Sequence, residues 1–566
     1  MLSSLAVALL LVGLPGTSAT AQEDSYETMF VVVSAGHQRT LDNLNYIGEL
    51  AQNDELAADL SKLMAGLMQV QGLDLMALGG IVPDRPWVFA VRTDQVNLFV
   101  LGMLPVSDVE ATLNSLAPLV GPFNKGDDGV YKLGEGEMTG FVKVHDGWAY
   151  FAQLPDHLAS LPAPAELLGD LPGDYDFALR VNVSRIPEAF RTLAVDWMRG
   201  IGVAGGGGLL PATGRDGIAN AFVRAVGDHR DHLVERCLTE VETMTLGLRL
   251  DQQAGKGLSE LHIRPLTGSS LDGHLDQLAG TKTRFGGLID SASKSTVQMN
   301  LTGPLDEKSS VELSLMLAAY RATVVDAITD APEITTDEQR LAFIDLTGGI
   351  VDAIDQTVRD GTLDGVLRVA QAGRNFRVIG AIHVTDGAAI AAQLERYAQW
   401  AESDEGSPTP ERTDHNGTTI YGLAIEEAPG LQMLSRVFGA SRLYMAARPD
   451  SFWVALGPEA LEQLRVAMDG PEAEVPPMRL EMKAAQLVSI GSQLADDQNL
   501  RTMLAVMRLG LGGTADQMIV EAAPSGRALV VKGELGRDVL RVPAMVLPAV
   551  SSMLLQGGRG IPGLGR

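Results

Sequence analysis

Cysteine is nearly absent from the sequence, since Cys237 is the only one among 566 residues. One thiol cannot form an internal disulfide, so the fold must be stabilised by burial of apolar side chains, which a chain of this length permits. Cys237 lies in a helical pattern, HLVERCLTEVETM, without a recognisable set of histidine and asparagine partners. We interpret it as a small buried apolar residue rather than a reactive thiol.

Basic residues are scarce relative to acidic ones. Lysine and arginine together number 44, against 71 aspartates and glutamates, which gives a net charge of −27. Such a surface repels phosphate groups, which argues against nucleic acid as a partner and disfavours anionic membrane surfaces. We expect this charge to keep a large exported protein soluble.

Long apolar runs are also lacking. The run Leu5–Leu14 is too short to span a bilayer, and it is followed by Ala19, Thr20 and Ala21, which form a small-residue cleavage site. We therefore predict a signal peptide over residues 1–21 and export to the periplasm or the extracellular space. No transmembrane segment is expected after its removal.

The C-terminal region contains one further apolar stretch, residues 542–555, which Pro543 and Pro548 interrupt. We expect this stretch to form a terminal helix docked on the core, with an exposed apolar end that meets a partner as the alternative. Residues 556–566 have the glycine-rich composition of a flexible tail.

The chain contains an internal similarity. The segments Val88–Leu116 and Val366–Leu394 align without gaps at a shift of 278 residues, with nine of twenty-nine positions identical. Such self-similarity indicates a duplicated unit. We predict two related halves, over residues 28–285 and 286–555.

Each copy of this segment has the pattern of a β-hairpin followed by a helix. Ser107 and Thr385 are the expected N-caps, and Asp108 and Asp386 are expected in the first turn of the helix. Hairpins alternating with helices favour an α+β fold, with antiparallel sheet covered by helices in each half. The number of sheets in each half stays open.

A glycine-rich stretch, Met198–Gly217, raises the question of a phosphate-binding loop. A P-loop needs a lysine directly after its glycines, whereas the first cation here is Arg215. A helical pattern rather than a strand precedes the glycines, which argues against a dinucleotide fingerprint. We interpret the stretch as a flexible connection to a helical insertion near residues 215–241, and we expect no nucleotide cofactor.

The strongest candidate for a metal site is a helical stripe formed by Asp228, His232 and Glu235. Carboxylates and imidazoles on one helix face can bind zinc. The alternative is a solvated face on which Arg230 and Arg236 form ion pairs, which the spacing favours. We assign no catalytic, cofactor-binding or metal-ligating residues and expect no cofactor.

Two further patterns carry less chemical information. The motif Ser291–Lys294 matches the S-x-x-K of penicillin-recognising enzymes, but no S-D-N follows it in a suitable place. The rings of Trp148, Tyr150, Phe452 and Trp453 lie on matching predicted strands and resemble a carbohydrate-binding face. Core packing is the favoured interpretation, because aromatic residues make up only 5% of the chain.

Units such as LGMLPVSDVEATLNSL, together with the signal peptide, resemble a loose group of large, acidic, exported bacterial proteins of unknown function. This resemblance implies no catalytic residues. Our leading hypothesis is an exported, non-catalytic structural or binding protein with a protein or cell-envelope partner. The alternatives are a hydrolase with a site between the halves, or a carrier of an apolar ligand beneath a curved sheet.

Overall fold

The computed structural model describes residues 26–56, 58–60, 78–94, 97–134, 140–188, 190–191, 232–290, 294–331, 334–404, 407, 409–426, 434–439, 441–495 and 498–545. The predicted signal peptide, the glycine-rich stretch and the predicted tail lie outside the described residues. In this described part, no helix combines the length and the apolar character that crossing a membrane requires.

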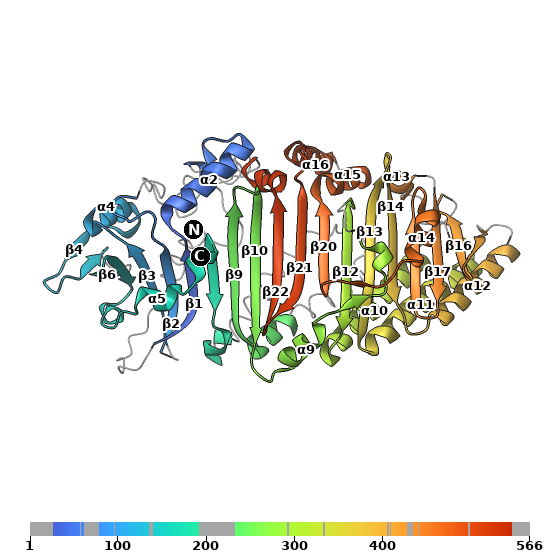
Figure 1. Ribbon diagram of the computed structural model, residues 1–566, viewed down its shortest axis with the longest axis horizontal. Coiled ribbons are helices and arrows are strands. Elements are labelled where there is room, and N and C mark those ends of the chain that lie inside the picture. Colours follow the sequence, from blue (N-terminus) through green and yellow to red (C-terminus); the bar gives the residue numbers. More distant parts are fainter. Residues whose placement is uncertain are drawn as a thin grey trace.

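The described strands confirm the predicted α+β class, because twenty of them form one antiparallel sheet that helices border and cover. Figure 1 shows the strands side by side along the longest axis of the molecule. Among the strands in the described ranges, only the short β11 (Lys282–Thr283) and β19 (Ala473–Glu474) pair outside this sheet.

The sheet has two sets of ten strands that meet at its centre. From the centre outward, the first set is β10 (Lys256–Pro265), β9 (Val241–Asp251), β8 (Phe177–Val181), β1 (Glu27–Ser34), β2 (Trp87–Thr93), β3 (Leu98–Pro105), β7 (Trp148–Ala152), β6 (Gly140–His145), β5 (Tyr131–Leu133) and β4 (Phe123–Lys125). The second set is β22 (Ala528–Gly536), β21 (Gln517–Ser525), β20 (Met478–Lys483), β12 (Val297–Pro304), β13 (Thr362–Ala372), β14 (Asn375–His383), β18 (Ser451–Leu456), β17 (Arg442–Arg448), β16 (Thr418–Ala424) and β15 (Glu411–His415). Antiparallel pairing of β10 with β22 joins the two sets.

The described helices connect these strands. Before β9 they are α2 (His37–Ala51), α4 (Val109–Val120), α5 (Pro164–Leu168) and α6 (Leu171–Asp174), with 3₁₀ turns η1 (Pro155–Leu158) and η2 (Val183–Arg185). In the remainder they are α9 (Ser270–Leu278), η3 (Gly286–Leu288), α10 (Glu307–Thr329), α11 (Asp337–Arg359), α12 (Gly387–Ser403), α13 (Ser435–Phe438), α14 (Ala460–Met468), α15 (Ala484–Leu494) and α16 (Gln498–Gly510). Residues 232–240 and 537–545 are also helical.

The two halves have the same chain path through the sheet. The strands of each set can be numbered from one to ten outward from the centre. The chain then passes through these numbered positions in the same order in both sets. The predicted hairpins also share a register, because Phe89 pairs with Gly102 and, 278 residues later, Leu367 pairs with Gly380. Gene duplication and the proposed boundary at residue 285 stay predictions.

The predicted helix starts in these segments need a correction of one residue. The N-caps are Asp108 and Asp386, not Ser107 and Thr385. The Asp108 carboxylate accepts hydrogen bonds from the backbone N–H groups of Glu110 and Ala111, and Asp386 accepts one from Ala389 at 2.9 Å. A carboxylate is as good a cap as a hydroxyl, so the S/T-D dipeptide alone does not decide which residue caps.

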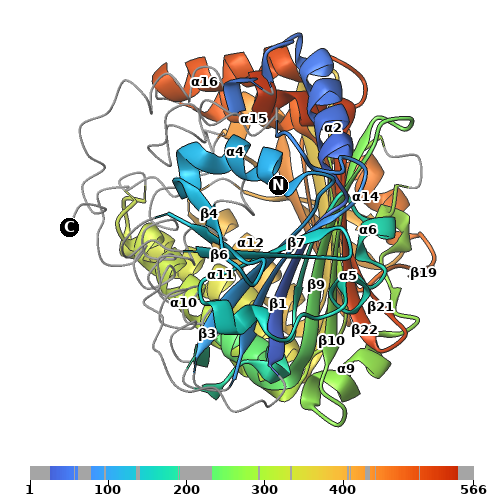
Figure 2. The same cartoon turned by 90° about the vertical axis from the view of Figure 1, so that its left-hand side faces the viewer.

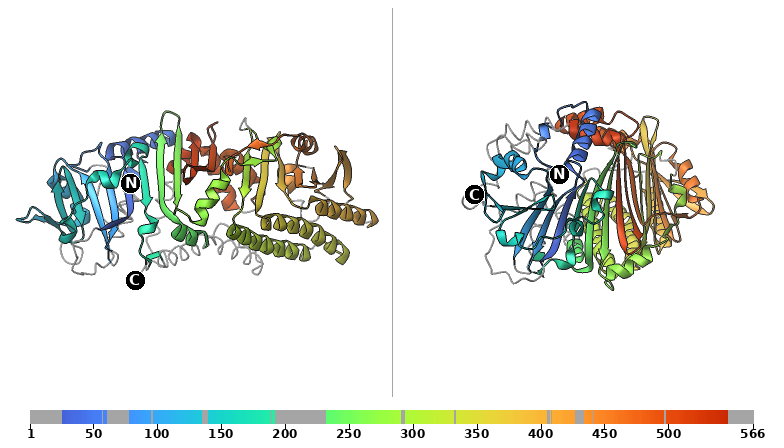
Figure 3. Two further views of the ribbon diagram at one scale, coloured as in Figure 1. Left: turned by 60° about the horizontal axis from the view of Figure 1, so that its bottom comes forward. Right: turned by 60° about the vertical axis from the view of Figure 1, so that its left-hand side comes forward.

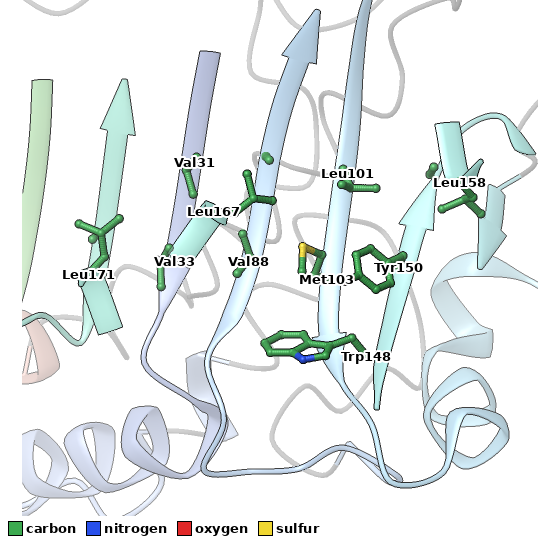
Figure 4. Packing of buried hydrophobic residues seen from close by; sticks show 13 residues of the cluster. Val31, Val33, Val88, Leu101, Met103, Trp148, Tyr150, Leu158, Leu167 and Leu171 are labelled. Atoms are coloured by element: carbon green, nitrogen blue, oxygen red, sulfur yellow. The ribbon is translucent and has the colours of Figure 1, made fainter. Parts of the chain in front are cut away.

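Toward the outer ends of the sheet, both sides of the strands are buried. On one side, η1, α5 and α6 cover a core that includes Val33, Val88, Met103 and Tyr150, as Figure 4 shows. The equivalent core of the second half lies under α14 and η3. On the other side, α4 covers the first half and α11 and α12 cover the second.

A buried carboxylate joins the helix before β9 to two helices of the following segment. Glu240 is 8% exposed and accepts hydrogen bonds from Ser270 Oγ at 2.6 Å, the Leu271 N–H at 3.0 Å and Lys308 Nζ at 3.1 Å. Burial acts to raise the pKa of Glu240, but the hydrogen bonds from Ser270 and Lys308 hold that pKa below its ordinary value. Arg236 adds an ion pair with Asp306, 3.1 Å between Nη2 and Oδ2.

We predict that Glu240→Gln lowers the free energy of unfolding by about 1–3 kcal/mol at pH 7, because its charged hydrogen bonds are lost. A carboxyl whose pKa is lowered by folding stabilises the fold above its unfolded pKa, about 4.3, and loses that contribution as the pH falls through the folded value. The difference between the two proteins in urea denaturation should therefore shrink below about pH 4. A difference that stays constant from pH 7 to pH 3 would contradict this role.

Candidate functional site

The central strands, from β8 to β12, have two chemically different sides. Paired residues of antiparallel strands point to the same side of a sheet, and successive residues of one strand alternate. The register therefore assigns each side chain to a side. One row that crosses the centre on a single side consists of Leu179, Leu246, Leu261, Val531, Ala522, Met478 and Leu301.

We call this side the apolar face, and it comprises the large apolar side chains that the register places on it. They are Phe177, Leu179, Val181, Met244, Leu246, Leu248, Leu250, Leu261, Ile263, Leu529, Val531, Leu535, Met518, Val520, Met478, Leu480, Met482, Val297, Met299 and Leu301. In β8, β10, β12, β20, β21 and β22, no residue on this side is charged. Glu242, at the start of β9, lies at a register shift, and its Oε2 is 3.6 Å from Nε of Arg264, a residue of the opposite side.

The side chains of the apolar face are not core residues. Each of them keeps measurable solvent exposure, and Leu248 and Leu535 reach 42% and 38%. By contrast, Val88 and Leu101, on the outer strands, are 0% exposed. In the folded protein, the broad apolar surface at the centre of the sheet is therefore only partly buried.

Helices border this face along both ends of its strands. Figure 2 shows α15 and α16 at one end and α10 and α11 toward the other, on the same side of the sheet. Figure 3 shows the same arrangement in two further views. At the first end, Met518 packs against the same buried cluster of Ala484, Val488 and Leu511 as Leu504 and Met507 of α16, which links the helix to the apolar face.

The opposite side of the same strands is charged. There, Arg479 Nη1 lies 2.7 Å from Glu521 Oε2, and its Nη2 lies 3.2 Å from Glu481 Oε2. The register places Lys532 between Glu260 and Glu521 in this row. Opposite charges on neighbouring strands stabilise a sheet by about 0.2–1 kcal/mol per pair.

One cluster on the charged side resembles a catalytic arrangement. The Tyr175 hydroxyl donates to Glu260 Oε2 at 3.0 Å, and His262 Nε2 lies 3.2 Å from both of these atoms. The ring of Tyr175 fits only because Gly247 has no side chain, since an added Cβ would lie 2.2 Å from the ring. The three side chains thus use their hydrogen-bonding groups on one another rather than on a ligand.

The ionisation of this cluster also favours a structural role. Burial and the hydrogen bond to Glu260 raise the pKa of Tyr175 to about 12, so the hydroxyl stays protonated and acts as a donor. Burial acts to raise the pKa of Glu260, but hydrogen bonds from His262 and Tyr175 hold it below the ordinary value. Glu260 is therefore a carboxylate at neutral pH and accepts both bonds.

The metal candidate of the sequence is only partly within the described residues. Asp228 lies outside them. His232 is exposed, with its Nδ1 3.2 Å from Glu312 Oε1, and Glu235 is exposed on the same helix. Within the described ranges, no group of three or more histidine, cysteine or acidic side chains is arranged to hold a metal ion.

The remaining predicted residues have ordinary structural surroundings. Cys237 is partly buried, and this burial raises the pKa of its thiol. Ser291 lies outside the described residues, while the N–H of Lys294 donates to Asp290 Oδ2 at 2.9 Å. The core interpretation of the four aromatic residues is confirmed, because they are 1–7% exposed, namely Trp148, Tyr150, Phe452 and Trp453.

The chain matches no protein-family model, and neither a curated protein nor a solved structure is significantly similar to it. The apolar face was not identified from the sequence. Its signal is present in β10 and β22, where every second residue is uncharged while the intervening residues include Glu260, His262 and Lys532. Recognising it also requires the pairing of strands far apart in sequence.

We predict that truncating the apolar face costs far less stability than truncating the core. Leu101→Ala should lower the free energy of unfolding by about 2–5 kcal/mol, because it leaves a cavity. Leu248→Ala, on a strand at the centre of the sheet, should change it by about 0.5 kcal/mol or less, because that side chain is already in contact with water. Urea denaturation of both variants tests this, and equal losses would show that the apolar face is part of the core.

Proposed function

We propose that the protein is an exported, non-catalytic binding protein that carries an apolar ligand on the apolar face of its central strands. The observation that supports this proposal is an uncharged surface of leucine, valine and methionine side chains that stay partly exposed. Contiguous exposed apolar surface with a polar border is typical of a binding site in a soluble protein. Export rests on the predicted signal peptide.

The dimensions of the face favour a ligand with long hydrocarbon chains. Seven neighbouring strands span six spacings of about 4.8 Å, so the face extends over roughly 29 Å. This distance is close to the hydrocarbon thickness of a bilayer, about 30 Å, which two acyl chains fill end to end. Transfer of each methylene group from water to such a surface contributes about 0.8 kcal/mol, so one acyl chain provides ample binding energy.

The charged side of the sheet offers weaker support for the hydrolase alternative. Tyr175, Glu260 and His262 do lie near the junction of the halves, but they bond to one another on the charged side. The ligand proposal also leaves them a clear role, which is to stabilise the charged side of the same strands. We therefore favour binding over catalysis.

The proposal predicts different effects for two neighbouring residues. Val531→Gln places an amide on the apolar face and should weaken the binding of a fluorescent fatty acid, 11-(dansylamino)undecanoic acid, by about tenfold or more. A buried amide without a hydrogen-bond partner costs on the order of 1–3 kcal/mol. The measurement is fluorescence titration of the mature protein, followed by displacement with unlabelled palmitate.

Lys532→Gln is the matched control, because Lys532 follows Val531 in the same strand and points to the charged side. This variant should bind the probe with unchanged affinity. Failure of the wild-type protein to bind the probe, or equal weakening by both substitutions, would refute the proposed function.

A further inference from the structure

Helix α16 exposes apolar side chains to an unusual degree. Leu500, Met503 and Leu509 are 41%, 54% and 76% exposed, although α16 spans only thirteen residues. Met545, which is 38% exposed, lies beside the helix, since its Sδ would be 3.3 Å from a Cβ at Gly510. We call these four side chains the α16 patch.

The region around α16 lacks the acidic excess of the protein as a whole. Helices α15 and α16 contain Arg501 and Arg508 and no acidic residue, while Asp496 and Asp497 lie between them in the sequence. The pair α10 and α11 has eight acidic residues against four basic ones. Because charges more than about 8–10 Å apart are screened in physiological salt, the local charge of α16 decides what it can touch.

The α16 patch is also connected to the apolar face. Leu504 and Met507 of α16 pack against the same buried cluster as Met518, and Met518 pairs with Leu535 and Met482 of the neighbouring strands. A continuous set of apolar side chains therefore extends from the exposed surface of α16 to the central strands. A hydrocarbon chain that crosses at this edge stays in contact with apolar groups.

We propose that α16 docks on the surface of a lipid bilayer and that acyl chains pass between the bilayer and the apolar face along this helix. The proposal rests on the proposed function and adds a location for ligand transfer. Exposed apolar side chains with arginines on the same short helix are the features with which helices bind in the interfacial region of a membrane. Arg508 pairs with a lipid phosphate, and the acidic helices α10 and α11 stay away from the phosphates.

The test is flotation of the mature full-length protein with vesicles of phosphatidylcholine and phosphatidylglycerol in a 3:1 ratio. The wild-type protein should float with the vesicles. The triple variant L500S/M503S/L509S should partition onto them at least about tenfold less, because it loses most of the apolar surface that inserts. R508E should reduce partitioning onto these vesicles but not onto pure phosphatidylcholine.

The control variant is V311S/L315S, which removes two equally exposed side chains, 56% and 64%, from α10. It should float like the wild type. Wild-type protein that stays in solution, a triple variant that floats normally, or equal losses in the control would overturn the proposal. A wild-type dimer that does not bind vesicles and that the triple variant converts to a monomer would also overturn the proposal, because the α16 patch would then join two copies of the protein.

Binding of the fluorescent fatty acid separates this inference from the proposed function. A triple variant that keeps probe binding but loses flotation supports membrane docking through α16. If the triple variant does not fold, R508E decides the question, since it leaves every apolar side chain in place. Probe binding without any flotation of the wild type would leave the proposed function standing and remove the membrane contact.

Discussion

The antiparallel pairing of β10 with β22 is the interaction on which the rest of the structure depends. Eight residue pairs, from Lys256 with Gly536 to Ile263 with Leu529, join two ten-strand sets into one sheet. The strands approach closely at this seam, because an added Cβ at Gly533 would lie 2.3 Å from Ser259 Oγ. Without this pairing, both β10 and β22 would be edge strands with unpaired backbone groups.

The same pairing gives the centre of the sheet its two different sides. The outer strands have helices on both sides and therefore form closed cores. Near the seam, the charged side is stabilised by ion pairs such as that of Arg479 with Glu521. The apolar side of the same strands carries no such ion pairs, and its leucine, valine and methionine side chains stay partly exposed.

Much of the architecture could be predicted from the sequence. The hairpins and the helices after them follow from local alternation and helical spacing, and the shift of 278 residues correctly placed Gly102 and Gly380 at equivalent positions. Capping was predicted to within one residue, because Ser107 and Asp108 are both good caps and only the backbone geometry selects between them. The core positions of Trp148 and Trp453 followed from the scarcity of aromatic residues.

The sequence by itself determined the period-two pattern of each strand and the capping signals of each helix, because these depend on neighbours within a few residues. Only the tertiary structure decided which alternate residues meet across strands, since Leu179, Leu261, Val531 and Leu301 are brought together by pairings between residues up to hundreds of positions apart. Side-chain exposure was likewise a tertiary property, because it depends on where the covering helices end. The apolar face arises from that combination and from no local motif.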